Sequence, residues 1–98
     1  MNQLKNKVTL LPDAPGVYLF KDAREKIIYI GKAKSIKKRV SSYFTRFLSS
    51  KTQMLVSKII DLDYILTPSE EQAQLLEASL IKDKQPHYNI SLKDDKSF

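Results

Sequence analysis

The chain has 98 residues, with 17 basic and 11 acidic side chains, two glycines and no cysteine. The length favours a single domain spanning residues 1–98. The lack of cysteine excludes a disulfide scaffold, a zinc–thiolate site and a thiol nucleophile, and the single histidine excludes a multi-histidine metal site. No apolar run reaches membrane-spanning length and no signal-peptide pattern follows Met1, so we expect a cytoplasmic protein.

The first part of the chain is predicted to form a polar lead and an antiparallel hairpin. Residues 1–15 are polar and end in a proline-containing turn. Residues 16–21 and 27–30 are rich in residues that favour strands, and the polar turn at 22–26 between them favours a hairpin. Gly31 is expected to end the second strand.

Two helices are predicted after the hairpin. Residues 33–48 carry an apolar stripe at helical spacing. The stripe consists of Ile36, Val40, Phe44 and Phe47. Residues 52–60 are predicted to be a shorter helix, with Thr52 as its N-cap.

A third strand and a last helix complete the predicted elements. Apolar side chains alternate over residues 62–66 and predict the strand. The S-x-x-Q box at 69–72 opens a helix that is expected to run to about residue 84 and to be followed by a polar tail over 86–98. This order of elements indicates an α+β fold, in which helices flank a small three-stranded antiparallel sheet.

The positive charge is concentrated in the middle of the chain. Residues 26–60 contain nine basic and no acidic side chains. A long acid-free segment of this kind indicates a face that binds a polyanion such as DNA, although solvated lysine-rich surfaces are also common. The candidate DNA contacts in this segment are Lys34, Lys37, Lys38 and Arg46.

Three polar side chains share one side of the helix predicted after Gly31. If the helical spacing is extended back to Lys32, then Arg39 and Tyr43 each fall within about 20° of Lys32. They lie beside the apolar stripe, where long cationic side chains either bind a phosphate or simply flank the core. Gly31 itself permits a positive φ or a close approach of the backbone.

Glu77 stands within the apolar arc of the last predicted helix, between Leu80 and Ile81 in angular position. A carboxylate in such a place is costly unless it is paired or binds a metal. Three interpretations are open: a buried salt bridge to Arg39, a place at the edge of the arc, or a ligand of one Mg²⁺ or Mn²⁺, which prefer oxygen atoms.

Tyr18 and Tyr29 lie close to the two glycines, in the two strands of the predicted hairpin. Strand tyrosines are commonly packing residues, and a pKa near 10 is too high for a base at neutral pH. Lys32 and Arg39 would lower this pKa by stabilising a phenolate. With the basic helix and Glu77, the tyrosines indicate metal-assisted attack on a phosphodiester.

Gly16-Val17-Tyr18, followed by Tyr29-Ile30-Gly31, resembles the signature of the GIY-YIG nuclease family. Further blocks resemble the N-terminal domains of UvrC-type excision nucleases, so that the resemblance covers nearly the whole chain. The matching blocks are 11–18, 29–44, 75–82, 85–90 and 92–98.

The resemblance implies an endonuclease domain that uses one divalent cation, Mg²⁺ or Mn²⁺. Its substrate would be damaged double-stranded DNA, cut on the 3′ side of the lesion in bacterial nucleotide excision repair after UvrA and UvrB have loaded. By position, Glu77 is the implied metal ligand and Arg39 the group that stabilises charge on the phosphate. Tyr29 is the implied general base or relay, with Tyr18 close to it.

The resemblance also implies supporting residues. Lys32 and Tyr43 would complete the charge and hydrogen-bond environment of the site, and Gly31 and Asn89 would support it. The 5′ incision, the UvrB-binding segment and the helix-hairpin-helix part of the family lie further along the chain, so we expect this chain to be an N-terminal fragment of a longer protein.

The chain departs from the family pattern in the hairpin turn. Family members usually carry a glycine after Asp22, where this chain has the residues 23–26, Ala-Arg-Glu-Lys. A non-catalytic module of the same fold, which binds only DNA or protein, remains an alternative, although it has no use for a carboxylate at Glu77. The blocks 29–44 and 85–98 argue against a restriction or homing nuclease.

Overall fold

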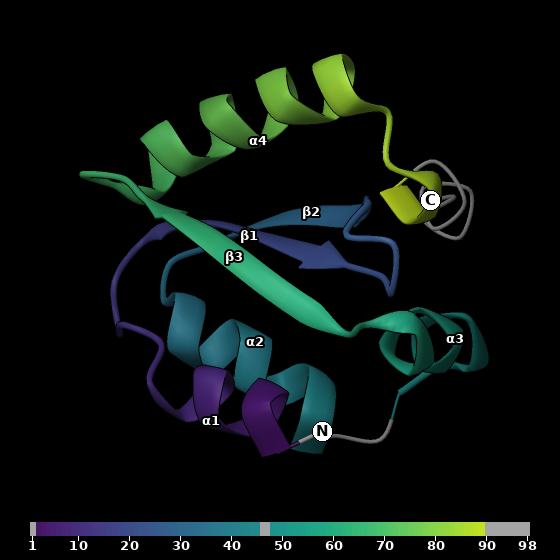
Figure 1. Ribbon diagram of the computed structural model, residues 1–98. Coiled ribbons are helices and arrows are strands. Elements are labelled where there is room, and N and C mark those ends of the chain that lie inside the picture. The colour runs from purple at the N-terminus through teal and green to yellow at the C-terminus, as the bar shows by residue number, and fades with distance from the viewer. Residues whose placement is uncertain (1, 46–47, 90–98) are drawn as a thin grey trace.

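The structure is a computed structural model that describes residues 2–45 and 48–89. The chain folds into the predicted α+β arrangement, with one helix more than expected (Figure 1). The elements are α1 (Asn2–Thr9), β1 (Gly16–Lys21), β2 (Ile27–Ala33), α2 (Ile36–Thr45), α3 (Ser50–Lys58), β3 (Asp61–Leu66) and α4 (Glu70–Lys84).

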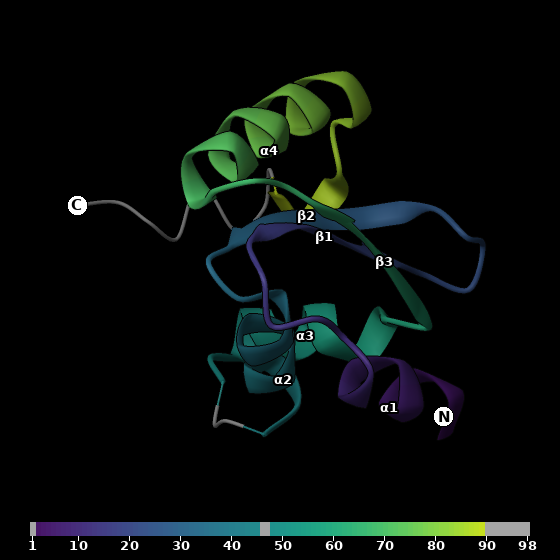
Figure 2. The same ribbon diagram turned by 90° about the vertical axis from the view of Figure 1, so that its left-hand side faces the viewer.

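The three strands form one antiparallel sheet in the order β2-β1-β3. Helix α4 covers one face of the sheet, and α1, α2 and α3 cover the other (Figures 1 and 2). The central strand β1 is therefore buried on both faces, and every residue from Gly16 to Phe20 is buried. Because β2 and β3 are edge strands, each leaves one side of its backbone open to other groups.

The alternation of side chains in β1 divides the core into two layers. Tyr18 and Phe20 belong to the larger layer, beneath α1, α2 and α3. Val17 and Leu19 belong to the smaller layer, which includes Ala73 of α4. The helices on both faces of the sheet therefore pack against side chains of the same strand, β1.

Helix α1 corrects the polar lead predicted for residues 1–15. Val8 and Leu11 are buried, and Leu4 packs against them in the larger core layer. The spacing of four residues places Leu4 and Val8 on one face of α1, and Leu11 follows just after the helix ends. Because the segment is otherwise polar, packing against the core stabilises this helix more than its own propensity does.

The junction between β2 and α2 also differs from the prediction. β2 continues through Gly31 to Ala33, and α2 begins at Ile36 instead of residue 33. The hydroxyl of Ser35 accepts a hydrogen bond from the N–H of Lys38 at 3.3 Å, as an N-cap does. Lys32 is therefore a strand residue, and its predicted place on the helical stripe with Arg39 is wrong.

The apolar face of α2 is narrower than predicted. Ile36 and Val40 are fully buried and Tyr43 is 8% exposed, whereas Phe44 is 36% exposed. Phe47 lies outside the described residues. Tyr43 thus takes the core position that the sequence pattern assigned to Phe44.

In the remaining helices, α3 and α4, the N-cap residue determines where the helix begins. α3 begins one turn earlier than predicted, because Ser49 instead of Thr52 is its N-cap. The predicted cap of α4 is confirmed, since the hydroxyl of Ser69 accepts a hydrogen bond from the N–H of Gln72 at 3.2 Å. In the predicted tail, residues 87–89 form a short helical turn.

The turn between β1 and β2 works without a glycine. The carboxylate of Asp22 accepts hydrogen bonds from the N–H groups of Arg24 and Lys26, at 2.9 and 3.1 Å. Glu25 takes the left-handed conformation, with φ of 61°. A residue with a β-carbon is strained in this conformation, whereas glycine is not.

Replacing Glu25 by glycine is therefore expected to raise the free energy of unfolding by about 0.5–1 kcal/mol. Urea unfolding of the two proteins measures this difference. Glu25→Ala is the control, because it removes the side-chain carboxylate but keeps the strain, and it should give no such gain. A less stable Glu25→Gly protein would contradict this account of the turn.

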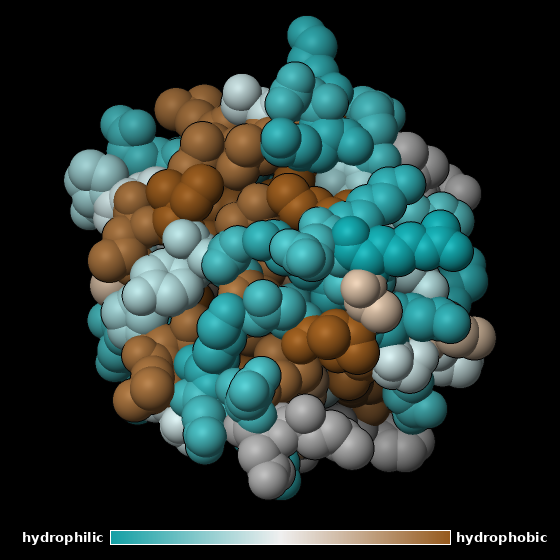
Figure 3. Space-filling view, in the orientation of Figure 1, coloured by the Kyte–Doolittle hydropathy of each residue, from teal (hydrophilic) through white to brown (hydrophobic). Residues whose placement is uncertain are grey.

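An apolar surface lies over β3 and the adjoining part of α4 (Figure 3). Its exposed side chains include Tyr64, Ile65, Leu66 and Leu75. β2 and β3 are the two edge strands, so this apolar surface and the polar groove beside β2 lie at opposite edges of the sheet. Among the described residues, no helix combines the length and apolar character needed to cross a lipid bilayer.

Candidate active site

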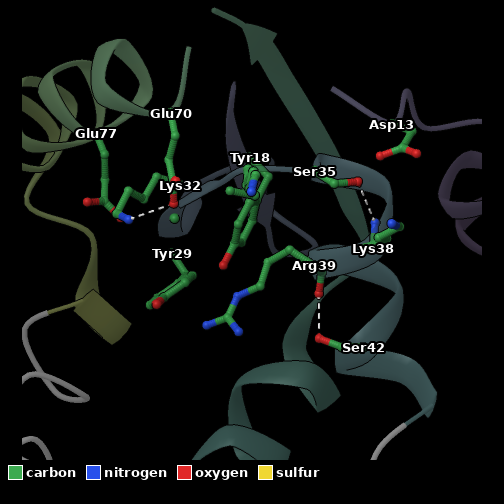
Figure 4. A pocket seen from close by; sticks show the side chains of 13 residues that line it. Asp13, Tyr18, Tyr29, Lys32, Ser35, Lys38, Arg39, Ser42, Glu70 and Glu77 are labelled. Atoms are coloured by element: carbon green, nitrogen blue, oxygen red, sulfur yellow. Dashed lines mark hydrogen bonds and ion pairs between the residues drawn. The ribbon is translucent and has the colours of Figure 1, made fainter. Parts of the chain in front are cut away.

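A polar groove of about 850 Å³ lies at the free edge of β2, between α4 and α2 (Figure 4). Eight of the residues singled out in the sequence line it. They are Tyr18, Tyr29, Gly31, Lys32, Lys34, Lys38, Arg39 and Glu77. Of the other four, Tyr43, Asn89 and Lys37 are not part of the lining, and Arg46 lies outside the described residues.

The edge position of β2 explains why residues from both faces of the sheet meet here. Lys32 is opposite Val17, whose side chain packs on the α4 side, so Lys32 also faces α4. Tyr29 is opposite Phe20 and packs with it on the α2 side. A groove at an edge strand is thus reached by α4 from one face and by α2 from the other.

Three tyrosines are packed together on the α2 side of the groove. The ring centroids of Tyr18 and Tyr29 are 6.3 Å apart, and those of Tyr29 and Tyr43 are 6.5 Å apart. The hydroxyls of Tyr18 and Tyr43 are hydrogen bonded at 2.9 Å, and the Arg39 guanidinium lies 5.5 Å from the centroid of the Tyr43 ring. Tyr43 therefore positions Tyr18 and Arg39 from behind the groove.

The acidity of the tyrosines contradicts the sequence-based expectation. Burial raises the pKa of Tyr29 above its ordinary value, and the neighbouring Tyr43 raises it further. Burial also raises the pKa of Tyr18, followed by the influence of Tyr43 and Tyr29. Arg39 acts in the opposite direction on both, but the loss of solvent outweighs it. In the protein alone, both hydroxyls keep their protons at neutral pH.

Gly31 is required by the close packing of Tyr18 across the sheet. The two residues are directly opposite each other in β1 and β2. A β-carbon on Gly31 would overlap the hydroxyl and two ring carbons of Tyr18. Of the two roles considered for this glycine, the structure therefore supports close approach and not a positive φ, which neither glycine has.

Asn89 binds the open side of the edge strand. Its side-chain N–H donates to the carbonyl of Ile30 at 2.8 Å, and its side-chain oxygen accepts from the N–H of Ile30 at 2.7 Å. The amide group thus replaces a neighbouring strand at the residue between Tyr29 and Gly31. Asn89 lies outside the groove, and by binding Ile30 it helps to hold Tyr29 and Gly31 in place.

Glu77 lies at the edge of the apolar arc of α4. Its side chain is half-buried and lines the groove, while Leu76 and Leu80 pack against the smaller core layer. The carboxylate therefore lies at the edge of the arc and faces the groove, a position from which it can bind a cation. Among the described residues, no cluster of three or more His, Cys, Asp or Glu side chains is present, so a cation at Glu77 would keep most of its water ligands.

Sequence reasoning missed a second acid in the groove. Glu70 seemed to be an ordinary first-turn residue of the last helix, but its carboxylate is 3.4 Å from the ammonium of Lys32. The signal was present in the spacing, because residues seven apart lie on one face of a helix. Asp13, Ser35 and Ser42 also line the groove, and no local pattern marked them.

The N-terminus of α2 is not itself a phosphate site. Its first N–H groups donate to the chain before β1, from Ile36 to the carbonyl of Ala14 and from Lys37 to that of Pro12, both at 3.0 Å. On this side of the groove, the cationic side chains that can bind a phosphate are those of Lys34, Lys38 and Arg39.

The chain is similar to several known proteins. The family described as "UvrC-like GIY-YIG domain" matches residues 14–90. UvrABC system protein C from Streptococcus pyogenes serotype M5 (strain Manfredo) is 57% identical over 99 residues, and the protein from serotype M49 (strain NZ131) is equally similar. These matches cover 100% of this chain but only 17% of the length of each Streptococcus protein.

Solved structures resemble the chain as well. The GIY-YIG N-terminal endonuclease domain of UvrC from Thermotoga maritima, bound to its catalytic magnesium, has a TM-score of 0.81 and 36% sequence identity, over 90% of this chain and 97% of that one. A point variant of the same domain, with an asparagine replaced by alanine and a catalytic divalent cation bound, has the same TM-score of 0.81.

Proposed function

Because this chain belongs to the UvrC-like GIY-YIG endonuclease domains, we propose that it hydrolyses a phosphodiester of damaged DNA with one divalent cation held by Glu77. The observation that carries this proposal is the convergence of Glu77, Tyr29 and Arg39 in one open groove. These residues come from three different elements, and a module that only binds DNA needs no carboxylate among its cations.

The donors in the groove fit Mg²⁺ or Mn²⁺. Glu77 offers an oxygen ligand on a rigid helix, and the open groove leaves space for water molecules and for a phosphate. When bound, the cation supplies positive charge at the phosphate and makes water a stronger nucleophile. The role of Glu77 is to hold the cation at the edge of β2, within reach of the tyrosine side of the groove.

Arg39 is the proposed group that stabilises negative charge on the phosphate. Its guanidinium extends from α2 toward Tyr29 in the groove (Figure 4). The planar guanidinium donates hydrogen bonds in a fixed fork, which suits phosphate oxygens. Lys34 and Lys38 line the groove beyond it and would bind neighbouring phosphates of the same strand, while Lys37 would contact the strand outside the groove.

Tyr29 is the proposed base or relay for the attacking water. Its hydroxyl oxygen can accept a hydrogen bond from water, which orients the water toward the phosphate. It can take the proton only if additional positive charge in the groove lowers its raised pKa. Tyr43 holds Tyr18 by its hydrogen bond, and both keep Tyr29 in place by ring packing.

The similarity to the Streptococcus proteins, of which this chain spans 17% of the length, supports a proposal for the wider biological role. We propose that it acts in the cytoplasm as the nuclease domain of a longer protein, incises on the 3′ side of a lesion in excision repair, and is brought to the lesion by UvrB after UvrA. Parts of the protein outside this chain would make most of the contacts with UvrB.

Strand breakage on lesion-bearing duplex DNA tests the proposal. With UvrA, UvrB and Mg²⁺ or Mn²⁺ present, the protein is expected to nick the damaged strand, and chelation with EDTA should stop the reaction until Mg²⁺ is added back. Salt-sensitive DNA binding without metal-dependent nicking would instead support the non-catalytic module.

A further inference from the structure

Lys32 lies between two carboxylates on the α4 side of the groove. Its ammonium is 3.4 Å from Glu70, and the side chains of the pair are 34% and 48% exposed. Figure 4 shows Glu70 and Glu77 pointing toward Lys32 from two places along α4. The two acids are seven positions apart, which corresponds to about two helical turns, so both carboxylates face the same strand residue.

The start of α4 is fixed to the sheet, so Glu70 has a defined place relative to Lys32. The carbonyl of Ser69 accepts a hydrogen bond from the hydroxyl of Thr67 at 2.8 Å. The N–H of Thr67 donates to the carbonyl of Pro15 at 3.0 Å, next to the first residue of β1. Lys32 is in the neighbouring strand, opposite Val17.

We propose that Glu70 is a positioning residue for Lys32. When a divalent cation occupies Glu77, the ammonium of Lys32 pairs with the carboxylate of Glu70. This inference rests on the proposed function, in which Glu77 is the metal ligand. An ammonium and a divalent cation are attracted to the same carboxylate and repel each other. Glu70 gives Lys32 a second carboxylate, so that the cation does not have to displace Lys32 into an unpaired position.

The proposal makes the effect of Glu70 depend on Lys32. Without Glu70, Glu77 is the carboxylate that remains on the α4 side of the groove among the residues that the structure describes, and the ammonium competes with the cation for it. Without both Glu70 and Lys32, the competition disappears. A purely long-range effect of the Glu70 charge would behave differently, because it would remain when Lys32 is removed.

Calorimetric titration of the whole chain with Mn²⁺, without DNA, tests this dependence. Glu70→Gln is expected to weaken Mn²⁺ binding about fivefold to tenfold, and Lys32→Met in the Glu70→Gln protein should restore most of the loss. Lys32→Met alone should change the affinity by less than about threefold. Glu71→Gln is the matched control, since it removes the same charge from the same helical turn at an exposed position outside the groove.

The nicking reaction offers a second readout. Glu70→Gln should raise the Mg²⁺ concentration needed for half-maximal nicking by a similar factor and leave the rate at saturating Mg²⁺ within about twofold of wild type. Equal weakening by Glu70→Gln and Glu71→Gln, or equal tightening by Lys32→Met in both backgrounds, would overturn the proposal. Full Mn²⁺ affinity in Glu77→Gln would instead overturn the proposed function on which it rests.

Discussion

Replacing Glu77 by glutamine is expected to slow metal-dependent nicking by about a thousandfold or more, because it removes the carboxylate proposed to hold the cation. The side chain keeps its size and remains at the edge of the apolar arc of α4. The free energy of unfolding should therefore stay within about 0.5 kcal/mol of wild type. Nicking rates at saturating Mg²⁺, with urea unfolding of the same proteins, measure both effects.

The control for Glu77 is Glu71→Gln, six positions earlier in α4 and outside the groove. It removes one negative charge from the same helix and should nick at close to the wild-type rate. Equal nicking by wild type and Glu77→Gln would show that the carboxylate has no part in the reaction. A stable but inactive Glu77→Gln protein would separate the role of this side chain from any role in folding.

The second large effect is expected from Gly31→Ala. The new methyl group would overlap Tyr18, which is 1% exposed and has no space to move within the core. We expect a loss of about 1–3 kcal/mol in the free energy of unfolding, together with loss of activity, because the hydrogen bond between Tyr18 and Tyr43 must also shift. Urea unfolding and nicking assays measure the two consequences.

A double-mutant cycle identifies the cause of the Gly31 effect. If the methyl group acts through Tyr18, then Gly31→Ala should cost much less in a protein that already carries Tyr18→Ala. An unchanged cost in that background would mean that the alanine disturbs the backbone of β2 instead of the tyrosine. Gly16→Ala is not a suitable comparison, since its β-carbon would meet the backbone carbonyl of Ile65.

Local signals predicted most of the fold. The hairpin, the third strand and the α4 helix follow from residues close together in sequence, such as the cap formed by Ser69 and Gln72. The α1 helix was missed because its few apolar residues acquire meaning only through the core that they cover. The limits of β2 and α2 were wrong by a few residues, since Ser35 and not Gly31 marks the change of element.

The candidate site was predicted in part because its members are chemically unusual for their positions. Glu77 was predicted within an apolar arc and Arg39 beside an apolar stripe, and the structure places both in the groove. Lys32 was assigned to the wrong element, although the structure places it in the groove together with Arg39 and Glu77. The pKa of Tyr29 was predicted in the wrong direction, since burial cannot be read from a strand pattern alone.

Other site residues depend on contacts that no local pattern encodes. Asn89 binds Ile30 across 59 residues of sequence, and only the resemblance to a family pointed to it. Gly31 could be recognised as special, but the reason is the tyrosine opposite it in the neighbouring strand. Glu70 needed the position of Lys32 in β2, which the sequence-based helix limits had obscured.

The central claim is that Glu77 holds the catalytic cation in front of Tyr29 and Arg39. Crystals of this chain soaked in Mn²⁺ and measured at a wavelength with anomalous manganese scattering test it most directly. The account predicts one anomalous peak at the carboxylate of Glu77, on its groove side, which is absent from crystals of Glu77→Gln. A peak elsewhere in the groove, or a peak that persists in Glu77→Gln, would contradict it.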